Sequence, residues 1–216
     1  TGDPVPNVHV QGQTVASREI DAITDRAASG GRLDTHEIAK LFEAIGPDVV
    51  RITAAADALR HGTVGDTATY VINRNINYTN MCLYRCGFCA FSKGTARELR
   101  GPAYRLNLEE VARRASEAVA RGATEVCLQG GIHPDFDGST YLNVLHAVRG
   151  AAPGIHIHAF SPLEITHGAQ TLGLPLRQYL LELKKAGLST PPGTAAEILD
   201  HEVRANICPD KLNTAE

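Results

Sequence analysis

Apolar residues recur early in the chain at the spacing of amphipathic helices, and later at the spacing of alternating strands and helices. Residues 1–15, with two prolines and two glycines, are predicted to be an irregular lead-in or linker. Residues 16–66 are predicted to be a helical segment. Three helices are expected there: Arg18–Ala28, a second that Asp34 and Thr35 cap and Gly46 stops, and a third that Asp48 caps and Gly62 stops.

From residue 67 to residue 216 the pattern is that of strands separated by helices. Strands are predicted at Thr69–Asn77, Glu125–Gln129 and Ile155–Phe160, with a weaker fourth near Leu188–Pro191. The predicted helices are one with an Asn107–Glu110 capping box and a stop at Gly122, one over Tyr141–Val148, one from Pro175 to Gly187, and one at about 194–206. This alternation predicts an α/β fold in which crossover helices join parallel strands.

The predicted strands have a polar face. Asn73, Asn75 and Asn77 alternate with other side chains in the first strand, and His156 and His158 alternate with isoleucines in the third. Because a strand has a period of two, each set lies on one face. Strands covered by helices on both faces are usually apolar throughout. A polar face therefore indicates either the lumen of a (β/α) barrel or an open sheet that faces solvent.

Three cysteines lie in one eight-residue window directly after the first predicted strand. Cys82, Cys86 and Cys89 have the spacing C-x3-C-x2-C, which suits three ligands of a four-iron cluster with one iron left open. A structural zinc site is the alternative, but it needs a fourth ligand, usually from a second C-x2-C pair that this chain lacks. Cys127 and Cys208 are isolated, and we expect them to be buried apolar residues.

The predicted barrel is incomplete. The four predicted strands do not close a barrel, and a complete (β/α) barrel has roughly 250 residues, against 216 here. We therefore expect the first half of a barrel behind a helical N-terminal segment, in a chain that is a fragment or lacks the second half.

Composition narrows the function classes. The formal net charge is −3, and no basic cluster indicates a nucleic-acid surface. The sequence has no run of eighteen apolar residues, the length that would predict a membrane span. The first residues lack a signal-peptide pattern. Thiols that must stay reduced for a cluster are typical of the cytoplasm.

At the cysteines the chain resembles the radical S-adenosylmethionine (SAM) enzymes, whose signature is C-x3-C-x-(aromatic)-C. Phe88 supplies the aromatic residue. The resemblance implies a 4Fe–4S cluster held by Cys82, Cys86 and Cys89, with SAM on the open iron. It also implies a partial or full (β/α) barrel with the cluster in the first βα loop.

Further motifs resemble the branch of this family that builds deazaflavins and futalosine-derived menaquinone. They are Asn73–Asn80 before the cysteines, Ala90–Ser92 after them, Leu128–Pro134, Ala159–Ile165 and Pro192–Glu197. The resemblance to radical SAM enzymes implies that Gln129, Gly130 and Gly131 bind SAM. Gly130 and Gly131 have no Cβ, so a ligand can approach their backbone closely; the alternative is a plain turn after the strand. Glu197 is implied to contact SAM ribose, although Thr194 and Glu197 also have the spacing of a helix capping box.

Four residues are candidates for the chemistry at the predicted catalytic rim: His133, His156, His158 and Glu164. His133 precedes a proline and is also typical of a plain turn. His156 and His158 are candidates for pyrimidine binding or proton transfer, and are equally typical of core histidines with satisfied hydrogen bonds.

The resemblance is strongest to the tyrosine-using members of the deazaflavin synthase family. It implies transfer of the hydroxybenzyl group of L-tyrosine to 5-amino-6-(D-ribitylamino)uracil by way of a 5′-deoxyadenosyl radical. The implied partners are an electron donor and a second radical SAM activity, in trans or fused. The alternatives are a menaquinone-pathway enzyme of the same branch and a non-catalytic iron–sulfur protein.

Overall fold

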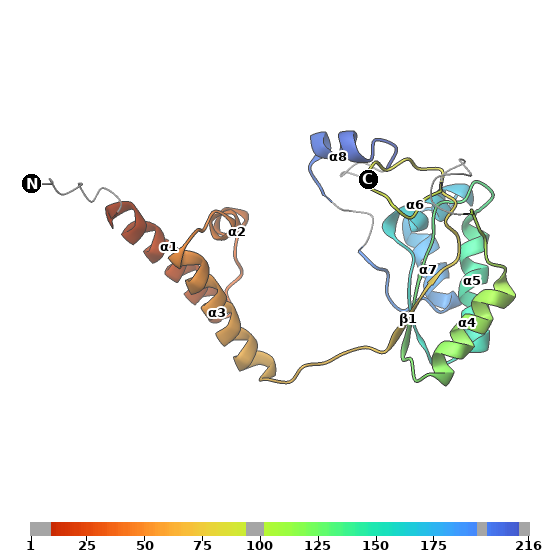
Figure 1. Ribbon diagram of the computed structural model, residues 1–216, viewed down its shortest axis with the longest axis horizontal. Helices are drawn as coiled ribbons and strands as arrows, with labels where there is room; N and C mark the ends of the chain where they lie inside the picture. The colour runs from red at the N-terminus through yellow and green to blue at the C-terminus, as the bar shows by residue number, and fades with distance from the viewer. Residues whose placement is uncertain (1–9, 94–101, 194–197, 212–216) are drawn as a thin grey trace, which may run out of the picture. The chain divides into compact units, whose positions relative to one another are not determined.

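A computed structural model describes residues 10–93, 102–193 and 198–211 of the chain. The chain divides into two compact units, Thr1–Thr69 and Tyr70–Glu216, a division that falls three residues after the predicted one. Figure 1 labels the helices and strands of both units. Among the described helices, none has both the length and the apolar character needed to cross a membrane.

The first unit contains three helices in its described residues: α1 (Val10–Ala28), α2 (Thr35–Phe42) and α3 (Pro47–Val64). Helix α1 starts at Val10, so residues 10–15 are helical and not irregular as predicted. Helix α2 begins with the predicted Asp34 cap, completed by the Glu37 side chain as a capping box. Helix α3 begins one residue before the predicted Asp48 cap, because Pro47 occupies its first turn, and continues past Gly62.

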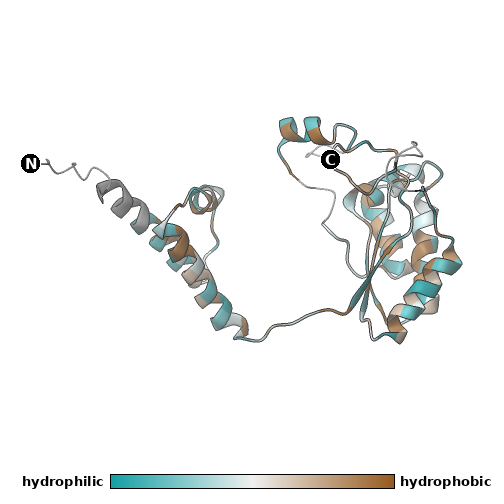
Figure 2. Cartoon of the chain, in the orientation of Figure 1, coloured by the Kyte–Doolittle hydropathy of each residue, from teal (hydrophilic) through white to brown (hydrophobic). Residues whose placement is uncertain are grey.

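Helix α3 buries none of its residues, the apolar ones included. Val49 and Leu59 of this helix are each 44% exposed. Hydrophobic and hydrophilic segments alternate along this helix in Figure 2. Helix α1 contributes the buried residues Ile20 and Ile23 instead.

The second unit is built on a parallel sheet. Its described strands are β1 (Asn73–Asn77), β2 (Glu125–Gln129) and β3 (His156–Ala159), in the order β1-β2-β3. Strand β2 has the predicted bounds, while β1 and β3 are shorter than predicted. The predicted fourth strand is limited to a parallel bridge between His158 and Thr190. The parallel α/β prediction is confirmed.

Five described helices accompany this sheet: α4 (Leu108–Ala120), α5 (Gly138–Ala151), α6 (Pro162–Thr171), α7 (Leu176–Ala186) and α8 (His201–Ile207). Asn107 caps α4 as predicted, but the Glu110 carboxylate pairs with arginines of its own helix and does not return to complete a capping box. Helix α6 was not predicted at all. The last helix starts at His201, later than predicted, and residues 194–197 lie outside the described residues.

One face of the sheet makes the core. Ile76, Val126, Leu128 and Ile157 are fully buried there, and α4 and α5 pack side by side in this layer (Figure 1). Helix α4 buries Ala118 and leaves its neighbour Val119 47% exposed. The residues that alternate with the core positions are half-buried or exposed, which confirms the predicted polar face.

Candidate functional site

The cysteine loop follows β1 and packs on the loop that follows β2. Cys82, Cys86 and Cys89 are all half-buried. The backbone amide of Ile132 lies 3.4 Å from the Cys82 sulfur, and that of Ser92 lies 3.4 Å from the Cys89 sulfur. Leu83 returns a backbone hydrogen bond of 2.8 Å to the Ile132 carbonyl. Because β1 and β2 are parallel neighbours, both loops lie at the carboxyl edge of the sheet.

The segment after α8 packs against the cysteine loop. The Gly87 amide donates to the Ile207 carbonyl at 2.8 Å, and the Arg85 amide donates to the Asp210 carboxylate at 3.3 Å. The ammonium of Lys211 lies 5.2 Å from the centre of the Phe88 ring, which is 49% exposed. Segments more than a hundred residues apart thus hold the loop in place.

The Cys86 thiol has a perturbed environment. Burial raises its pKa, Lys211 acts in the opposite direction, and the neighbouring Cys208, Cys89 and Cys82 add to the rise. Cys208 is buried, as predicted, whereas Cys127 was predicted to be buried and is only half-buried. Since iron binds thiolates, loading this site must release the protons that the thiols carry.

Gly130 and Gly131 bring the two loops into close contact. A Cβ atom at Gly131 would overlap the Met81 carbonyl oxygen, and one at Gly130 would overlap the Tyr78 ring. The Gly131 amide donates to the Thr79 carbonyl at 3.1 Å. Both glycines are therefore required by protein packing, and they also leave the backbone beside Cys82 without side chains.

Glu164 is a buried connection between three loops. Its carboxylate accepts hydrogen bonds from the Ser161 amide and hydroxyl, both at 2.6 Å, from the Gly130 amide at 3.1 Å, and from the Tyr78 hydroxyl. Burial raises the pKa of Glu164, and these hydrogen bonds act in the opposite direction. Both oxygens already accept hydrogen bonds, so the geometry makes Glu164 a positioning residue for the Gly130 loop.

His133 lies in the loop after β2. Its ring is buried and stacks on Phe136, with 4.8 Å between ring centres. The Asp135 amide donates to Nδ1 at 3.1 Å, which in a neutral ring leaves the proton on Nε2. Burial lowers the pKa of His133. These contacts are those of a neutral turn residue next to the cysteine loop.

The other two histidines lie further from the cysteine loop. His156 is the first residue of β3 and pairs in register with Glu125, the first residue of β2. The cysteine loop follows the carboxyl end of β1. His156 therefore lies at the other, amino-terminal end of the strands, and His158 lies within β3. Gln129 ends β2 beside the glycines. Glu197 lies outside the described residues.

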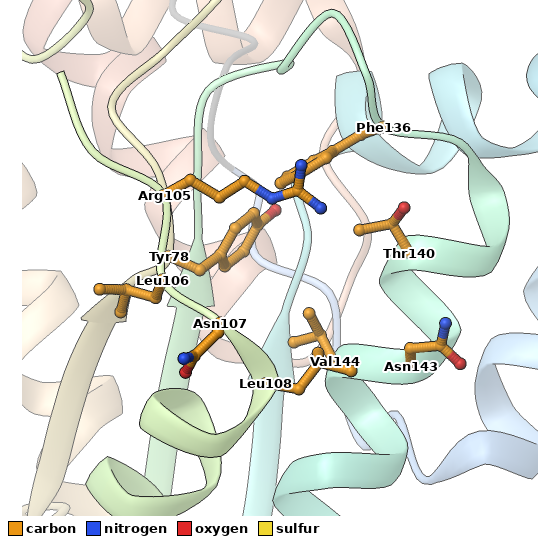
Figure 3. A pocket seen from close by; sticks show the side chains of 9 residues that line it. All are labelled: Tyr78, Arg105, Leu106, Asn107, Leu108, Phe136, Thr140, Asn143 and Val144. Atoms are coloured by element: carbon orange, nitrogen blue, oxygen red, sulfur yellow. The ribbon is translucent and has the colours of Figure 1, made fainter.

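A pocket of about 400 Å³ lies between the sheet and the first turns of α4 and α5. Figure 3 shows Arg105 extending past Tyr78 toward Phe136, with Thr140 on the far side. The Arg105 guanidinium carbon lies 4.9 Å from the centre of the Phe136 ring. Sequence reasoning did not identify this pocket, because no motif marks Arg105.

The residues at the carboxyl edge fit the cofactors that the cysteine motif implies. Three half-buried thiols in one short loop are a donor set for three irons of a cluster. Backbone without side chains at Gly130 and Gly131 lies against the same loop.

Comparison with known proteins agrees with this donor set. Residues 76–213 match the radical SAM superfamily. The chain belongs to this superfamily, whose members use a 4Fe–4S cluster and SAM.

Two curated relatives are more specific. The chain is 47% identical over 194 residues to the FO synthase of Streptomyces avermitilis, covering 90% of this chain and 22% of that protein. It is 52% identical over 161 residues to the 5-amino-6-(D-ribitylamino)uracil–L-tyrosine 4-hydroxyphenyl transferase of Archaeoglobus fulgidus, covering 74% of this chain and 45% of that protein. The chain thus spans about a fifth of the first relative and under half of the second.

Solved structures share the fold. The FeFe-hydrogenase maturase HydG from Carboxydothermus hydrogenoformans has a TM-score of 0.66 at 21% identity, covering 93% of this chain and 43% of that chain. Methylornithine synthase has a TM-score of 0.51 at 18% identity, covering 77% of this chain and 56% of that chain. The similarity to these two structures supports the predicted fold, a partial (β/α) barrel.

Proposed function

We propose that this chain is the cluster-binding part of a radical SAM enzyme of deazaflavin biosynthesis. The enzyme would join the hydroxybenzyl group of L-tyrosine to 5-amino-6-(D-ribitylamino)uracil. The observation that carries the radical SAM part is the packing of the three-cysteine loop on Gly130 and Gly131. The substrates are supported by relatives of 45–52% identity that are named for this transfer or as FO synthase.

Each residue has a separate task in this proposal. Cys82, Cys86 and Cys89 would hold three irons of the cluster, and the backbone at Gly130 and Gly131 would bind the SAM amino group. When bound, the cluster and SAM would supply radical chemistry for hydrogen abstraction from tyrosine. Glu164 holds the Gly130 amide and would thereby help to orient SAM. The Phe88 ring, which lies beside Lys211, would contact the adenosyl group of SAM.

The proposed partners follow from the reaction. An electron donor must reduce the cluster, and a second radical SAM activity, in trans or fused, must close the deazaflavin ring. The name FO synthase, carried by relatives of which this chain spans about a fifth, is consistent with a fused arrangement. A cytoplasmic location suits a site made of reduced thiols.

The test is a product assay on the full-length protein under anaerobic conditions. It is supplied with SAM, L-tyrosine, 5-amino-6-(D-ribitylamino)uracil and dithionite, and products are identified by mass spectrometry. We expect a tyrosine–uracil adduct that requires every component and that disappears in Cys86→Ala. Release of 5′-deoxyadenosine without the adduct would contradict the proposed assignment of the substrates. Turnover of a futalosine derivative would indicate menaquinone synthesis instead.

A further inference from the structure

A second group of potential metal ligands lies on the polar face of the sheet, away from the cysteine loop. Glu125 and His156 are paired in register at the amino ends of β2 and β3, and His158 follows on the same face. One ligand atom from each of these three residues lies within 4.8 Å of the other two. His156 Nε2 and Glu125 Oε2 are 3.7 Å apart.

These distances are close to those of a bound ion. Nitrogen and carboxylate ligands lie about 2.0–2.2 Å from zinc, so a tetrahedral site separates its ligand atoms by roughly 3.4 Å. Small rotations of the two imidazole rings would therefore bring all three ligand atoms to bonding distance. Such a site keeps one position open for water or another ligand.

Neighbouring polar groups already orient these side chains. The Asn73 amide donates to Glu125 Oε1 at 2.7 Å, while Oε2 is the atom nearer His156. The Thr190 hydroxyl lies 2.9 Å from His156 Nε2 and 2.7 Å from His158 Nδ1. A hydrogen-bonded partner on the other oxygen of a ligating carboxylate, as Asn73 is for Glu125, is typical of protein metal sites. A bound ion would replace the Thr190 hydrogen bond at His156 Nε2. The competing arrangement is the Thr190 hydrogen bonds alone, with no metal.

The group is accessible from outside the sheet. The side chain of His156 is 43% exposed and that of Glu125 is 19% exposed. The helices pack on the opposite, core face of the sheet, so the described residues leave a path for an ion to reach the three side chains.

We propose that Glu125, His156 and His158 bind one divalent first-row metal ion on the polar face of the sheet, toward the amino-terminal ends of β2 and β3. Two imidazoles and one carboxylate favour zinc, cobalt, nickel or copper over magnesium, which prefers oxygen ligands alone. This site shares no ligand with the cysteine loop, so binding of the ion can be measured separately from binding of the cluster.

The test is a cobalt(II) titration of the full-length protein followed by visible absorption. Cys82, Cys86 and Cys89 are replaced by serine, so that their thiols do not compete for the ion, and circular dichroism checks the fold. We expect one cobalt per chain at this site. His158→Gln should weaken binding by about tenfold or more, since the loss of even a supporting group costs ten- to a hundredfold. His146→Gln, at an exposed position of α5, should leave the affinity unchanged.

A second measurement uses the protein with its cysteines intact and its cluster assembled. Zinc should raise the melting temperature of this protein, because an ion that binds only the folded state stabilises it. The rise should persist in His146→Gln and vanish in His158→Gln. Binding that survives both His156→Gln and His158→Gln, or no binding at all, would overturn the proposal. Neither measurement uses a substrate, so failure here leaves the proposed reaction unaffected.

Discussion

The Glu164 carboxylate accepts a hydrogen bond from the Gly130 amide, 3.1 Å away and 34 positions earlier in the chain. Glu164 also accepts from the hydroxyl of Tyr78, the first residue after β1. The segments that follow β1, β2 and β3 therefore meet at one buried carboxylate. This connection fixes the backbone on which the cysteine loop packs.

Replacing Glu164 with glutamine should destabilise the fold. Glutamine has nearly the same shape as glutamate. Each carboxylate oxygen of Glu164 accepts hydrogen bonds, so the NH2 group that replaces one of them would face hydrogen-bond donors instead of acceptors. An unsatisfied buried donor costs about 1–3 kcal/mol. Urea denaturation of Glu164→Gln should show a loss of this size in the free energy of unfolding.

Two variants complete this experiment. Glu109→Gln changes the same residue type at an exposed position in the first turn of α4, and should cost no more than the roughly 0.3–1 kcal/mol of a charge at a helix N-terminus. Tyr78→Phe removes a single hydroxyl donor and should cost less than Glu164→Gln. Equal stability of the Glu164 and Glu109 variants would show that the buried connection contributes nothing.

Gly131→Ala should displace the cysteine loop. The added methyl would overlap the Met81 carbonyl, which belongs to the backbone and has no other rotamer to adopt. Overpacking of this kind costs about 1–3 kcal/mol, and we also expect a lower iron content after reconstitution. Gly150→Ala is the matched control, because nothing lies within 4 Å of a Cβ there. Since Gly150 is in α5, that change should stabilise the protein by about 0.5–1 kcal/mol.

The three loop cysteines should differ from Cys127 in iron binding. Alanine at Cys82, Cys86 or Cys89 removes one of the three proposed iron ligands, so most of the bound iron should be lost in each variant. Cys127 is also half-buried but lies within β2, away from the loop. Cys127→Ala should keep its iron, as measured by metal analysis and absorbance. Equal iron in all four variants would refute the assignment of the ligands.

Stability should fall as the pH drops below about 6.5, the ordinary pKa of histidine. Burial lowers the pKa of both His133 and His167 in the folded protein. Between the lowered values and the ordinary one, the unfolded chain binds more protons, so acid favours unfolding. Denaturant unfolding at several pH values should show this decline.

His133→Asn should reduce that pH dependence. An asparagine oxygen can replace Nδ1 as the acceptor for the Asp135 amide, and asparagine does not titrate. His146→Gln, at an exposed site, should keep the pH dependence of the parent protein. A slope that His133→Asn leaves unchanged would mean that another group causes it.

Local patterns predicted much of the second unit. Strand β2 has its predicted bounds because its apolar and polar residues alternate between clear turn signals. Helix α6 was missed, although Ser161 and Glu164 have the spacing of a capping box, which the structure confirms. The same carboxylate also holds Gly130, and that long-range contact has no local signature.

Other features depend on packing that sequence patterns do not specify. Phe160 is fully buried with a φ of 61°, a conformation that is uncommon for a bulky residue. It turns the chain from β3 into α6, and no motif predicts it. Glu125 could have been recognised as a neighbour of His156, because parallel strands of known order place their first residues side by side.

The most direct test of the radical SAM assignment is the response of the cluster to SAM. The protein is purified without oxygen and reconstituted with iron and sulfide, and its EPR spectrum is recorded after reduction, with and without SAM. We predict about four irons per chain and a reduced-cluster signal that shifts when SAM is added. A protein that binds no cluster, or a cluster signal that SAM leaves unchanged, would contradict the assignment.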